Sequence, residues 1–252
     1  MGAIPARYAS TRLPGKPLLH LAGRPLIEHV YRRVAQARGL DRVVVLTDDE
    51  RIARAVEAFG GEWEMTPADC PSGTDRIAHA ARRWDAAAVV NVQGDEPLID
   101  PEAVRRVAEH LRDHPGDPVV TLAAPATAEE TESSHVVKVV LDRRGHALYF
   151  SRAAIPFARE GNATRLKHLG VYGYQRAALL QLAALDPTPL ERSESLEQLR
   201  ALEHGIAIRV LLVEGAAQGV DTAEDLARAE QALASVTEPS PPSQILSGDR
   251  RP

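Results

Sequence analysis

Short runs of β-branched residues alternate with amphipathic stretches through the first half of this 252-residue chain. Three of these runs, at residues 42–47, 87–92 and 118–124, predict buried strands. The segments between them carry helix-start signals, such as Pro25 in a first turn and Asp100 followed by proline. Strands separated by helices of this length need right-handed crossover connections. The pattern therefore predicts an α/β fold built on a mostly parallel sheet.

The pattern changes after about residue 125, where strand signals follow one another with short turns. We expect a hairpin, a further strand, one long helix ended by Gly205 and a last strand. The predicted ranges are 136–141 and 146–151 for the hairpin, 166–174 for the strand, 189–204 for the helix and 206–213 for the last strand. Together they predict an antiparallel addition that covers the parallel core.

One domain is expected over residues 1–235, because no linker-like composition interrupts the pattern. Its core would comprise about 1–125 and 206–235, with the antiparallel subregion at about 126–205. The last segment, 236–252, is rich in proline and serine. That composition cannot bury enough apolar surface to order itself, so we predict a disordered tail.

A basic segment at residues 4–18 follows the first short apolar run. It carries Arg7, Arg12 and Lys16 within ten positions. Three prolines remove backbone donors and disfavour helical geometry before them, so the segment is predicted to be neither helix nor strand. Cations at the end of a first strand indicate a polyphosphate site, although a solvated basic loop is the alternative. The pattern is neither the usual phosphate-binding loop nor a G-x-G-x-x-G fingerprint.

Two aspartates occupy positions that suit a magnesium ion. Asp95 follows a predicted strand end, and Asp221 precedes the last predicted helix. Singly, each has a simpler explanation: Asp95 as a turn residue and Asp221 as a helix cap. Beside a polyphosphate loop they instead resemble Mg²⁺ ligands, because this ion prefers a few carboxylates together with phosphate oxygens. The scattered histidines show no zinc spacing, and no G-x-S-x-G nucleophile motif is present.

Three further groups of polar residues are candidates for ligand contacts. Residues 72–76 (SGTDR) are either a simple capped helix start or a surface that reads a nucleobase edge. Arg152 and His168 lie at or near strand ends. Glu197 and Gln198 lie on the predicted long helix, where a solvated charged face is the alternative.

Composition narrows the class of function. The net charge of −5 argues against a general nucleic-acid binder, which would be basic overall. The only cysteine, Cys70, cannot form an internal disulfide, which fits a reducing compartment. The apolar runs are too short to span a bilayer, and no export signal is visible, so we expect a cytoplasmic protein with no membrane partner.

The motifs are collinear with those of one family. The segments IPARYASTRLPGKPL (4–18) and NVQGDEP (91–97) are the most specific, and 72–76, 149–152, 168–174, 196–200 and 219–222 accompany them. Over residues 3–235 the chain resembles the 3-deoxy-D-manno-octulosonate (Kdo) cytidylyltransferases, or CMP-Kdo synthetases. The first strand is shorter than usual in that family, and the loop between residues 159 and 167 is compact.

The resemblance implies a Rossmann-like nucleotidyltransferase fold of the glycosyltransferase-A type, in a homodimer. It implies Mg²⁺-dependent transfer of the cytidylyl group from CTP to Kdo, giving CMP-Kdo and pyrophosphate and activating Kdo for lipopolysaccharide or other cell-envelope polysaccharide. The alternatives are the same transfer to another acidic sugar, such as a sialic acid or an amino-Kdo, and a non-catalytic CTP-binding module.

The resemblance also assigns roles to individual residues. Those implied for CTP are Ala6, Arg7, Arg12, Lys16, Ser72, Gly73 and Arg76, and those implied for catalysis are Arg7, Arg12, Lys16 and Asp95. Those implied for the sugar are Gln93, Arg152, His168, Tyr172, Glu197 and Gln198. Asp95 and Asp221 would hold Mg²⁺.

Overall fold

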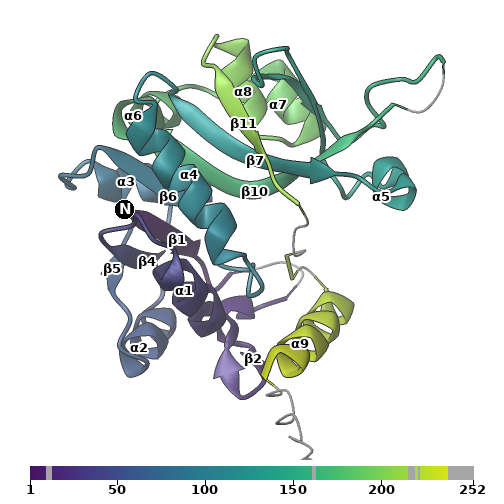
Figure 1. Ribbon diagram of the computed structural model, residues 1–252. Helices are drawn as coiled ribbons and strands as arrows, with labels where there is room; N and C mark the ends of the chain where they lie inside the picture. The colour runs from purple at the N-terminus through teal and green to yellow at the C-terminus, as the bar shows by residue number, and fades with distance from the viewer. Residues whose placement is uncertain (10–12, 161–162, 215–218, 221, 238–252) are drawn as a thin grey trace, which may run out of the picture.

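A computed structural model describes residues 1–9, 13–160, 163–214, 219–220 and 222–237 (Figure 1). Within these residues a mixed sheet runs in the order β11-β7-β10-β6-β1-β4-β5, and the hairpin β8–β9 continues from β10. The strands of this sheet are β1 (Gly2–Ala6), β4 (Val43–Thr47), β5 (Trp63–Met65), β6 (Ala88–Asn91), β7 (Val119–Pro125), β8 (Lys138–Leu141), β9 (Ala147–Ser151), β10 (Leu166–Gln175) and β11 (Ile208–Leu212).

Helices cover both faces of the sheet, as the alternating pattern predicts. In Figure 1, α1 and α4 lie in front of the sheet and α3 and α6 behind it. The remaining elements are short or lie at the edges. The helical bounds are η1 (Lys16–Leu18), α1 (Leu26–Gln36), α2 (Glu50–Ala58), α3 (Gly73–Ala81), α4 (Pro101–Asp113), α5 (Ala128–Glu132), α6 (Arg176–Ala183), α7 (Pro189–Glu194), α8 (Gln198–Glu203) and α9 (Ala223–Thr237), and a separate ribbon pairs β2 (His20–Leu21) with β3 (Arg24–Pro25).

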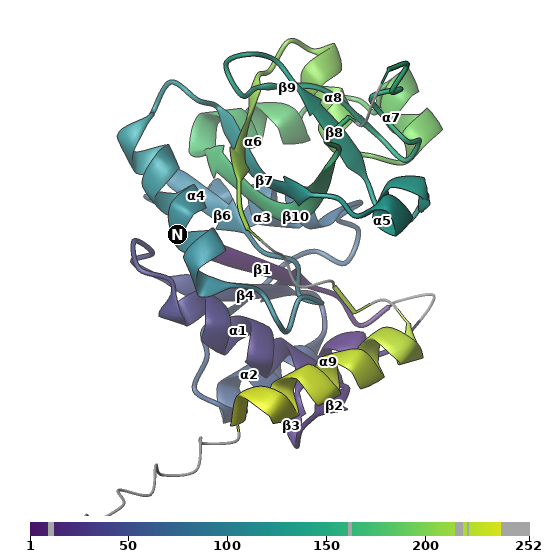
Figure 2. The same ribbon diagram turned by 45° about the vertical axis from the view of Figure 1, so that its right-hand side comes forward.

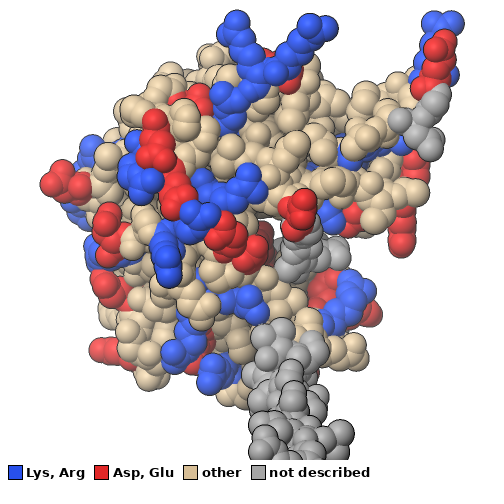
Figure 3. Space-filling model, in the orientation of Figure 1, with Lys and Arg blue, Asp and Glu red and all other residues tan. Residues whose placement is uncertain are grey.

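Side-chain caps account for where three of these helices begin. Ser72, Asp49 and Asp100 accept backbone hydrogen bonds at the starts of α3, α2 and α4. These side chains satisfy donors that the first helical turn leaves without a partner. On the outer face of α4, Arg105 pairs with Glu102 and Glu109, and acidic and basic side chains are interspersed over this side of the molecule (Figure 3).

The first strand reaches further than the sequence suggests. Residues 4–6 belong to β1 although Pro5 is among them, so the prediction that the whole segment 4–18 is neither helix nor strand was wrong at its start. The short helix η1 also forms at its end. On the side of β1 that faces β6, the carbonyls of Met1 and Ala3 accept hydrogen bonds, and the pairing with β6 ends at Ala3. Pro5 lies on that same side, beyond the last pair, where no ladder donor is needed.

The antiparallel strand lies inside the sheet. We expected β10 to belong to an addition covering the parallel core, but it pairs with β6 on one side and β7 on the other. β11 is parallel to β7. Along the order β11-β7-β10-β6-β1-β4-β5 the sheet is thus mostly parallel, with the antiparallel strand β10 near the middle. Periodicity shows that residues 166–174 form a strand, but it does not show which strands lie beside it.

The hairpin folds back toward the edge of the sheet. β8 pairs with β10 on one side and with β9 on the other (Figure 2). His146, in the turn just before β9, forms a bridge to Arg209 of β11. The side chains enclosed in this way include the fully buried Phe150 and Leu199. The subregion therefore extends the core that lies on one face of the sheet.

The predicted long helix at 189–204 was wrong, because two short helices occupy this range. α7 ends at Ser195, which adopts a left-handed conformation with φ of 53°. The break lets Leu196 enter the core while Glu194 accepts hydrogen bonds from the backbone and side chains around β9. An ion pair between Arg200 and Glu191 (2.6 Å) ties the two helices together.

The last helix packs beside the start of the chain. In Figures 1 and 2, α9 lies along β2 and α1, and its Ala229 and Leu233 join the core that contains Ile4 and Leu26. α9 runs to Thr237, two residues past the predicted boundary, and the rest of the predicted tail lies outside the described residues. None of the helices in the described part of the chain has the length and apolar composition that a bilayer crossing requires.

Asp117 links three elements at the edge of the sheet and should make stability depend on pH. Its carboxylate contacts His110 (2.6 Å) and Arg209 (3.3 Å). Burial alone would raise its pKa, but these two hydrogen bonds outweigh burial and hold the pKa below the ordinary 3.8. A lowered pKa means that the stabilisation is present above pH 3.8 and is lost as the pH falls through the pKa of the folded state.

We expect Asp117→Asn to lower the free energy of unfolding by about 1–2 kcal/mol at pH 6, with the difference from wild type shrinking toward pH 3. Urea denaturation at both pH values measures this. The exposed Asp186→Asn is the matched control and should show no such pH-dependent difference. A constant difference at both pH values would contradict the assignment.

Candidate active site

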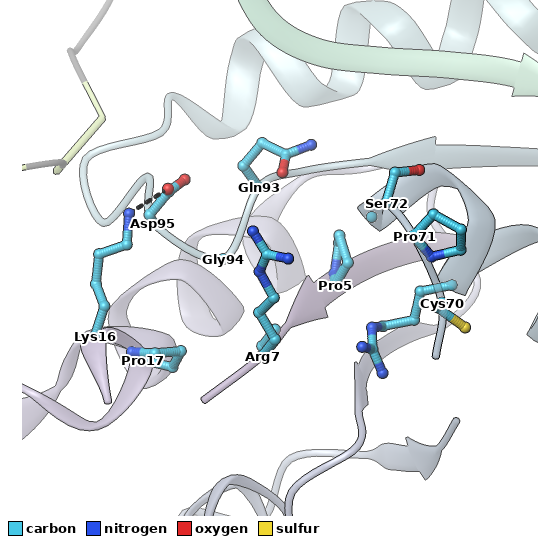
Figure 4. Close-up of a pocket in the computed structure, with 13 residues that line it drawn as sticks. Pro5, Arg7, Lys16, Pro17, Cys70, Pro71, Ser72, Gln93, Gly94 and Asp95 are labelled. Atoms are coloured by element: carbon cyan, nitrogen blue, oxygen red, sulfur yellow. Dashed lines mark hydrogen bonds and ion pairs between the residues drawn. The ribbon is translucent and has the colours of Figure 1, made fainter. Parts of the chain in front are cut away.

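Three segments distant in sequence enclose a cavity of about 390 Å³ beyond the ends of β1 and β6. The end of β1 and η1 contribute Arg7 and Lys16, the loop into α3 contributes Ser72, and the loop after β6 contributes Gln93 and Asp95 (Figure 4). Ligands of open α/β sheets bind at such strand ends. The full lining is Pro5, Ala6, Arg7, Lys16, Pro17, Cys70, Pro71, Ser72, Gly73, Arg76, Gln93, Gly94 and Asp95.

Glycine allows the three segments to approach one another closely. A Cβ on Gly94 would lie 2.9 Å from the carbonyl oxygen of Pro5, a contact with backbone that no side-chain rotation relieves. A Cβ on Gly73 would lie 3.1 Å from the Pro5 ring. Both glycines therefore keep the end of β1 in contact with its neighbours, and peptide groups line the cavity where bulkier residues would fill it.

The cations and the carboxylate meet on one side of the cavity. Lys16 Nζ lies 2.6 Å from an Asp95 carboxylate oxygen and donates a second hydrogen bond of 2.9 Å to the Val220 carbonyl. Arg7 is exposed and extends into the space between Lys16 and Ser72 (Figure 4). Arg12 lies outside the described residues. The result is a polar cavity wall with positive charge near the Asp95 carboxylate.

Arg76 has a different environment from the one expected for a base-reading side chain. It borders the cavity but is 3% exposed. Its guanidinium pairs with Asp48 (2.9 Å) and also donates to the Thr66 hydroxyl. These charge-assisted contacts tie the first turn of α3 to Asp48 and Thr66.

Cys70 borders the same cavity, which the sequence did not indicate. Burial raises the pKa of its thiol, so the side chain is a neutral, small wall residue at neutral pH. On the same side of the cavity (Figure 4), Ser72 caps α3 and its hydroxyl donates to the Asp75 carboxylate. The start of α3 thus presents backbone groups together with a hydroxyl.

A second space of about 160 Å³ adjoins the first through Gln93, which lines both. Gln93, Tyr172, Glu197 and Gln198, four of the six residues assigned to the sugar, line this adjoining cavity. Its polar atoms include two buried groups without a hydrogen-bond partner, Tyr172 Oη and Gln198 Nε2. Buried donors without partners cost free energy, so this cavity is built to accept a polar ligand. Burial also raises the pKa of Glu197, opposed by the hydroxyls of Thr74 and Ser72.

The other two residues assigned to the sugar lie elsewhere. His168 lines a third cavity of about 280 Å³, and its ring centroid lies 5.2 Å from that of Tyr172. Arg152 lines none of these three cavities. Its guanidinium donates to the carbonyls of Glu194 (2.8 Å) and Ser134 (3.0 Å).

Two residues of the site, Asn91 and Glu96, were not assigned a role from the sequence. Asn91 is buried in the adjoining cavity and accepts a hydrogen bond of 3.3 Å from the Gln93 amide. Glu96 lines the third cavity, where burial and the neighbouring Asp95 raise its pKa to about 8. Both lie in the 91–97 motif, so the motif marks the region without distinguishing their roles.

No group of three or more His, Cys, Asp or Glu side chains suited to a metal gathers within the described residues. Asp95 offers one carboxylate, and Asp221 lies outside the described residues. Val220, the residue before Asp221, is hydrogen bonded to this site: its amide donates to the Asp95 carbonyl (2.8 Å). One or two carboxylates beside a phosphate cavity fit the donor set that Mg²⁺ prefers.

The parallel sheet, the cation-lined cavity at its strand ends and the adjoining polar cavity define a nucleotide-binding α/β protein with room for a second substrate. Comparison with known proteins places it more closely. A family model described as "Cytidylyltransferase" matches residues 1–208. The chain belongs to the cytidylyltransferase family, and within it to the 3-deoxy-manno-octulosonate cytidylyltransferases.

The similarity extends over almost the whole chain. It is 51% identical over 241 residues to the 3-deoxy-manno-octulosonate cytidylyltransferase of Syntrophotalea carbinolica, covering 91% of this chain and 96% of the relative. The enzyme of that name from Myxococcus xanthus is 52% identical over 233 residues, covering 91% and 94%.

A solved structure of a CMP:2-keto-3-deoxy-manno-octonic acid synthetase complexed with CTP matches with a TM-score of 0.91 and 44% identity, covering 93% of this chain and 98% of the other. A cytidylyltransferase structure from Leptospira borgpetersenii shares the fold, with a TM-score of 0.64 at 18% identity.

Proposed function

We propose that this protein catalyses the transfer of the cytidylyl group of CTP to 3-deoxy-manno-octulosonate, giving CMP-Kdo and pyrophosphate. The observation that carries the proposal is the pair of cavities joined at Gln93. The cation-lined cavity suits a nucleoside triphosphate, and the adjoining one offers unpartnered polar groups to a hydroxylated sugar acid. The names of the relatives point to the same two substrates.

The reaction needs an in-line attack on the α-phosphorus of CTP. The anomeric hydroxyl of the sugar forms the new P–O bond and loses its proton, while the bond to the β-phosphate oxygen breaks and pyrophosphate leaves. Negative charge builds up on the leaving group. We infer that Arg7 and Lys16, which line the cavity, neutralise this charge. Preorganised cations of this kind supply much of the rate enhancement in phosphoryl chemistry. Arg12 takes the same role by resemblance.

Magnesium is proposed as the metal, held by Asp95 and Asp221. When bound, it supplies positive charge that stabilises the phosphate oxygens as the bond to pyrophosphate breaks. Lys16 pairs with Asp95 (2.6 Å). We infer that Lys16 exchanges this partner for a phosphate when CTP enters.

We also propose, from the family to which the chain belongs, that the protein is a cytoplasmic homodimer. A cytoplasmic protein has access to CTP. The product is an activated sugar for lipopolysaccharide or other envelope polysaccharides.

The test is pyrophosphate release from CTP and Mg²⁺ with Kdo and N-acetylneuraminate compared side by side. Release with Kdo alone supports both the reaction and the sugar. Release with N-acetylneuraminate in its place would preserve the mechanism and overturn the sugar. CTP binding without release from either sugar would contradict the proposed transfer and favour a non-catalytic CTP-binding module.

A further inference from the structure

The hydroxyl of Thr121 lies among three possible hydrogen-bond partners in the middle of the sheet. Thr121 is a fully buried residue of β7. Its Oγ1 is 2.8 Å from the Val171 carbonyl oxygen, 3.0 Å from His168 Nε2 and 3.3 Å from the Leu169 carbonyl oxygen. All three partners belong to β10, where the pairing with β7 shifts register between Leu169 and Tyr172. The irregularity turns carbonyls of β10 toward this hydroxyl.

The direction of each hydrogen bond follows from the proton count. A carbonyl oxygen cannot donate, so a separation of 2.8 Å between Oγ1 and the Val171 oxygen requires the hydroxyl proton to lie between them. Threonine has only one such proton. With that proton committed to a carbonyl, Oγ1 can meet His168 Nε2 only as an acceptor, and Nε2 must carry hydrogen.

The surroundings of His168 keep the ring neutral. The ring packs edge-on against Phe150, with centroids 5.2 Å apart, and also contacts Tyr172. Burial lowers the pKa of His168 to about 3. A neutral imidazole that is protonated at Nε2 carries a lone pair at Nδ1.

We propose that Thr121 is a positioning residue that fixes His168 in the Nε2–H form, so that His168, which lines the third cavity and packs against Tyr172 of the adjoining one, offers the sugar a hydrogen-bond acceptor at Nδ1. The inference rests on the proposed function for the identity of the sugar, but the protonation state itself does not. In this form Nδ1 can accept a hydrogen bond from a hydroxyl of the sugar and cannot donate one to its carboxylate. The carboxylate is left to donors such as Gln198 Nε2.

The protonation state is measurable without substrate. Histidine labelled with ¹⁵N gives different nitrogen shifts for protonated and lone-pair nitrogens, and His168→Gln identifies the signals of His168 among the nine histidines. We expect the wild-type protein at pH 7 to show His168 protonated at Nε2 alone. A proton on Nδ1, with or without one on Nε2, would overturn the proposal.

Two variants then test the part played by Thr121. Thr121→Val removes the hydroxyl at nearly constant volume, and Thr121→Ser keeps it. With valine, we expect mixed His168 tautomers and a KM for Kdo raised about tenfold, with CTP binding unchanged, because one hydrogen bond in the sugar site is compromised. Serine should restore both properties. Unchanged His168 signals in the valine variant would refute the positioning role.

The readouts separate this inference from the proposed function. If Kdo is not turned over, the proposed function fails while the wild-type spectrum still decides the tautomer. If the valine variant does not fold, the wild-type spectrum and the serine variant carry the test, and a serine variant with altered His168 signals counts against the proposal.

Discussion

Replacing Asp95 with asparagine is expected to lower kcat for cytidylyl transfer by about a hundredfold to a thousandfold, the size of loss that follows removal of one preorganised electrostatic group, such as an oxyanion-hole donor, from other enzymes. Asparagine keeps the size of the side chain and removes its charge. The carboxylate lies in the cation-lined cavity against Lys16, and it is the described member of the proposed Mg²⁺ pair. Pyrophosphate release under saturating CTP and Kdo measures kcat.

The same substitution should leave nucleotide binding largely intact. Without Mg²⁺, Asp95 repels the triphosphate and holds Lys16, so the variant should bind CTP with an affinity within about threefold of wild type. Calorimetric titration in the presence of a chelator measures this. Asp69→Asn, which removes an exposed carboxylate close in sequence to the wall residue Cys70, is the matched control and should keep normal kcat. Near-normal turnover by Asp95→Asn would remove Asp95 from the catalytic machinery.

The second large effect concerns stability. Lys138 is fully buried at the start of β8, and its ammonium donates to the carbonyls of Ser133 (2.7 Å), Val136 (2.7 Å) and Arg152 (2.6 Å). Its three hydrogen-bonding protons thus have three acceptors. Burial lowers the pKa of Lys138, which reflects the cost of desolvating the charge, so the net stabilisation is less than three charge-assisted hydrogen bonds would give.

Lys138→Met keeps most of the volume and leaves three carbonyls without a donor. We expect the free energy of unfolding to fall by about 3 kcal/mol, since each buried acceptor left unsatisfied costs about 1–3 kcal/mol and relaxation recovers part of the sum. Chemical denaturation measures the change. Arg143→Met, which removes an exposed cation from the turn of the same hairpin, should change stability by less than about 0.5 kcal/mol. A loss below about 1 kcal/mol for Lys138→Met would show that desolvation cancels the hydrogen bonds.

Much of the candidate active site can be predicted from the sequence. The cations of residues 4–18, the SGTDR helix start and the NVQGDEP loop follow strands or begin helices that local patterns identify. Parallel strands bring their carboxyl ends to one edge, so the loops that carry Lys16 and Asp95 were expected to face one another, and they line one cavity together with Ser72. The family resemblance, carried by the same motifs, is confirmed by the comparisons.

The sequence by itself determined which segments are strands and helices in the parallel half, where the caps lie and which loops carry charge, because these depend on neighbours a few positions apart. The tertiary structure alone decided that β10 lies between β6 and β7, and that the range 189–204 breaks at Ser195. It also decided that the guanidinium of Arg76 is occupied by Asp48, and that His168 meets Thr121, 47 positions away. Periodicity reports which face of an element is apolar. Which residues pack against that face, and which atoms accept its hydrogen bonds, depends on how distant segments pack together.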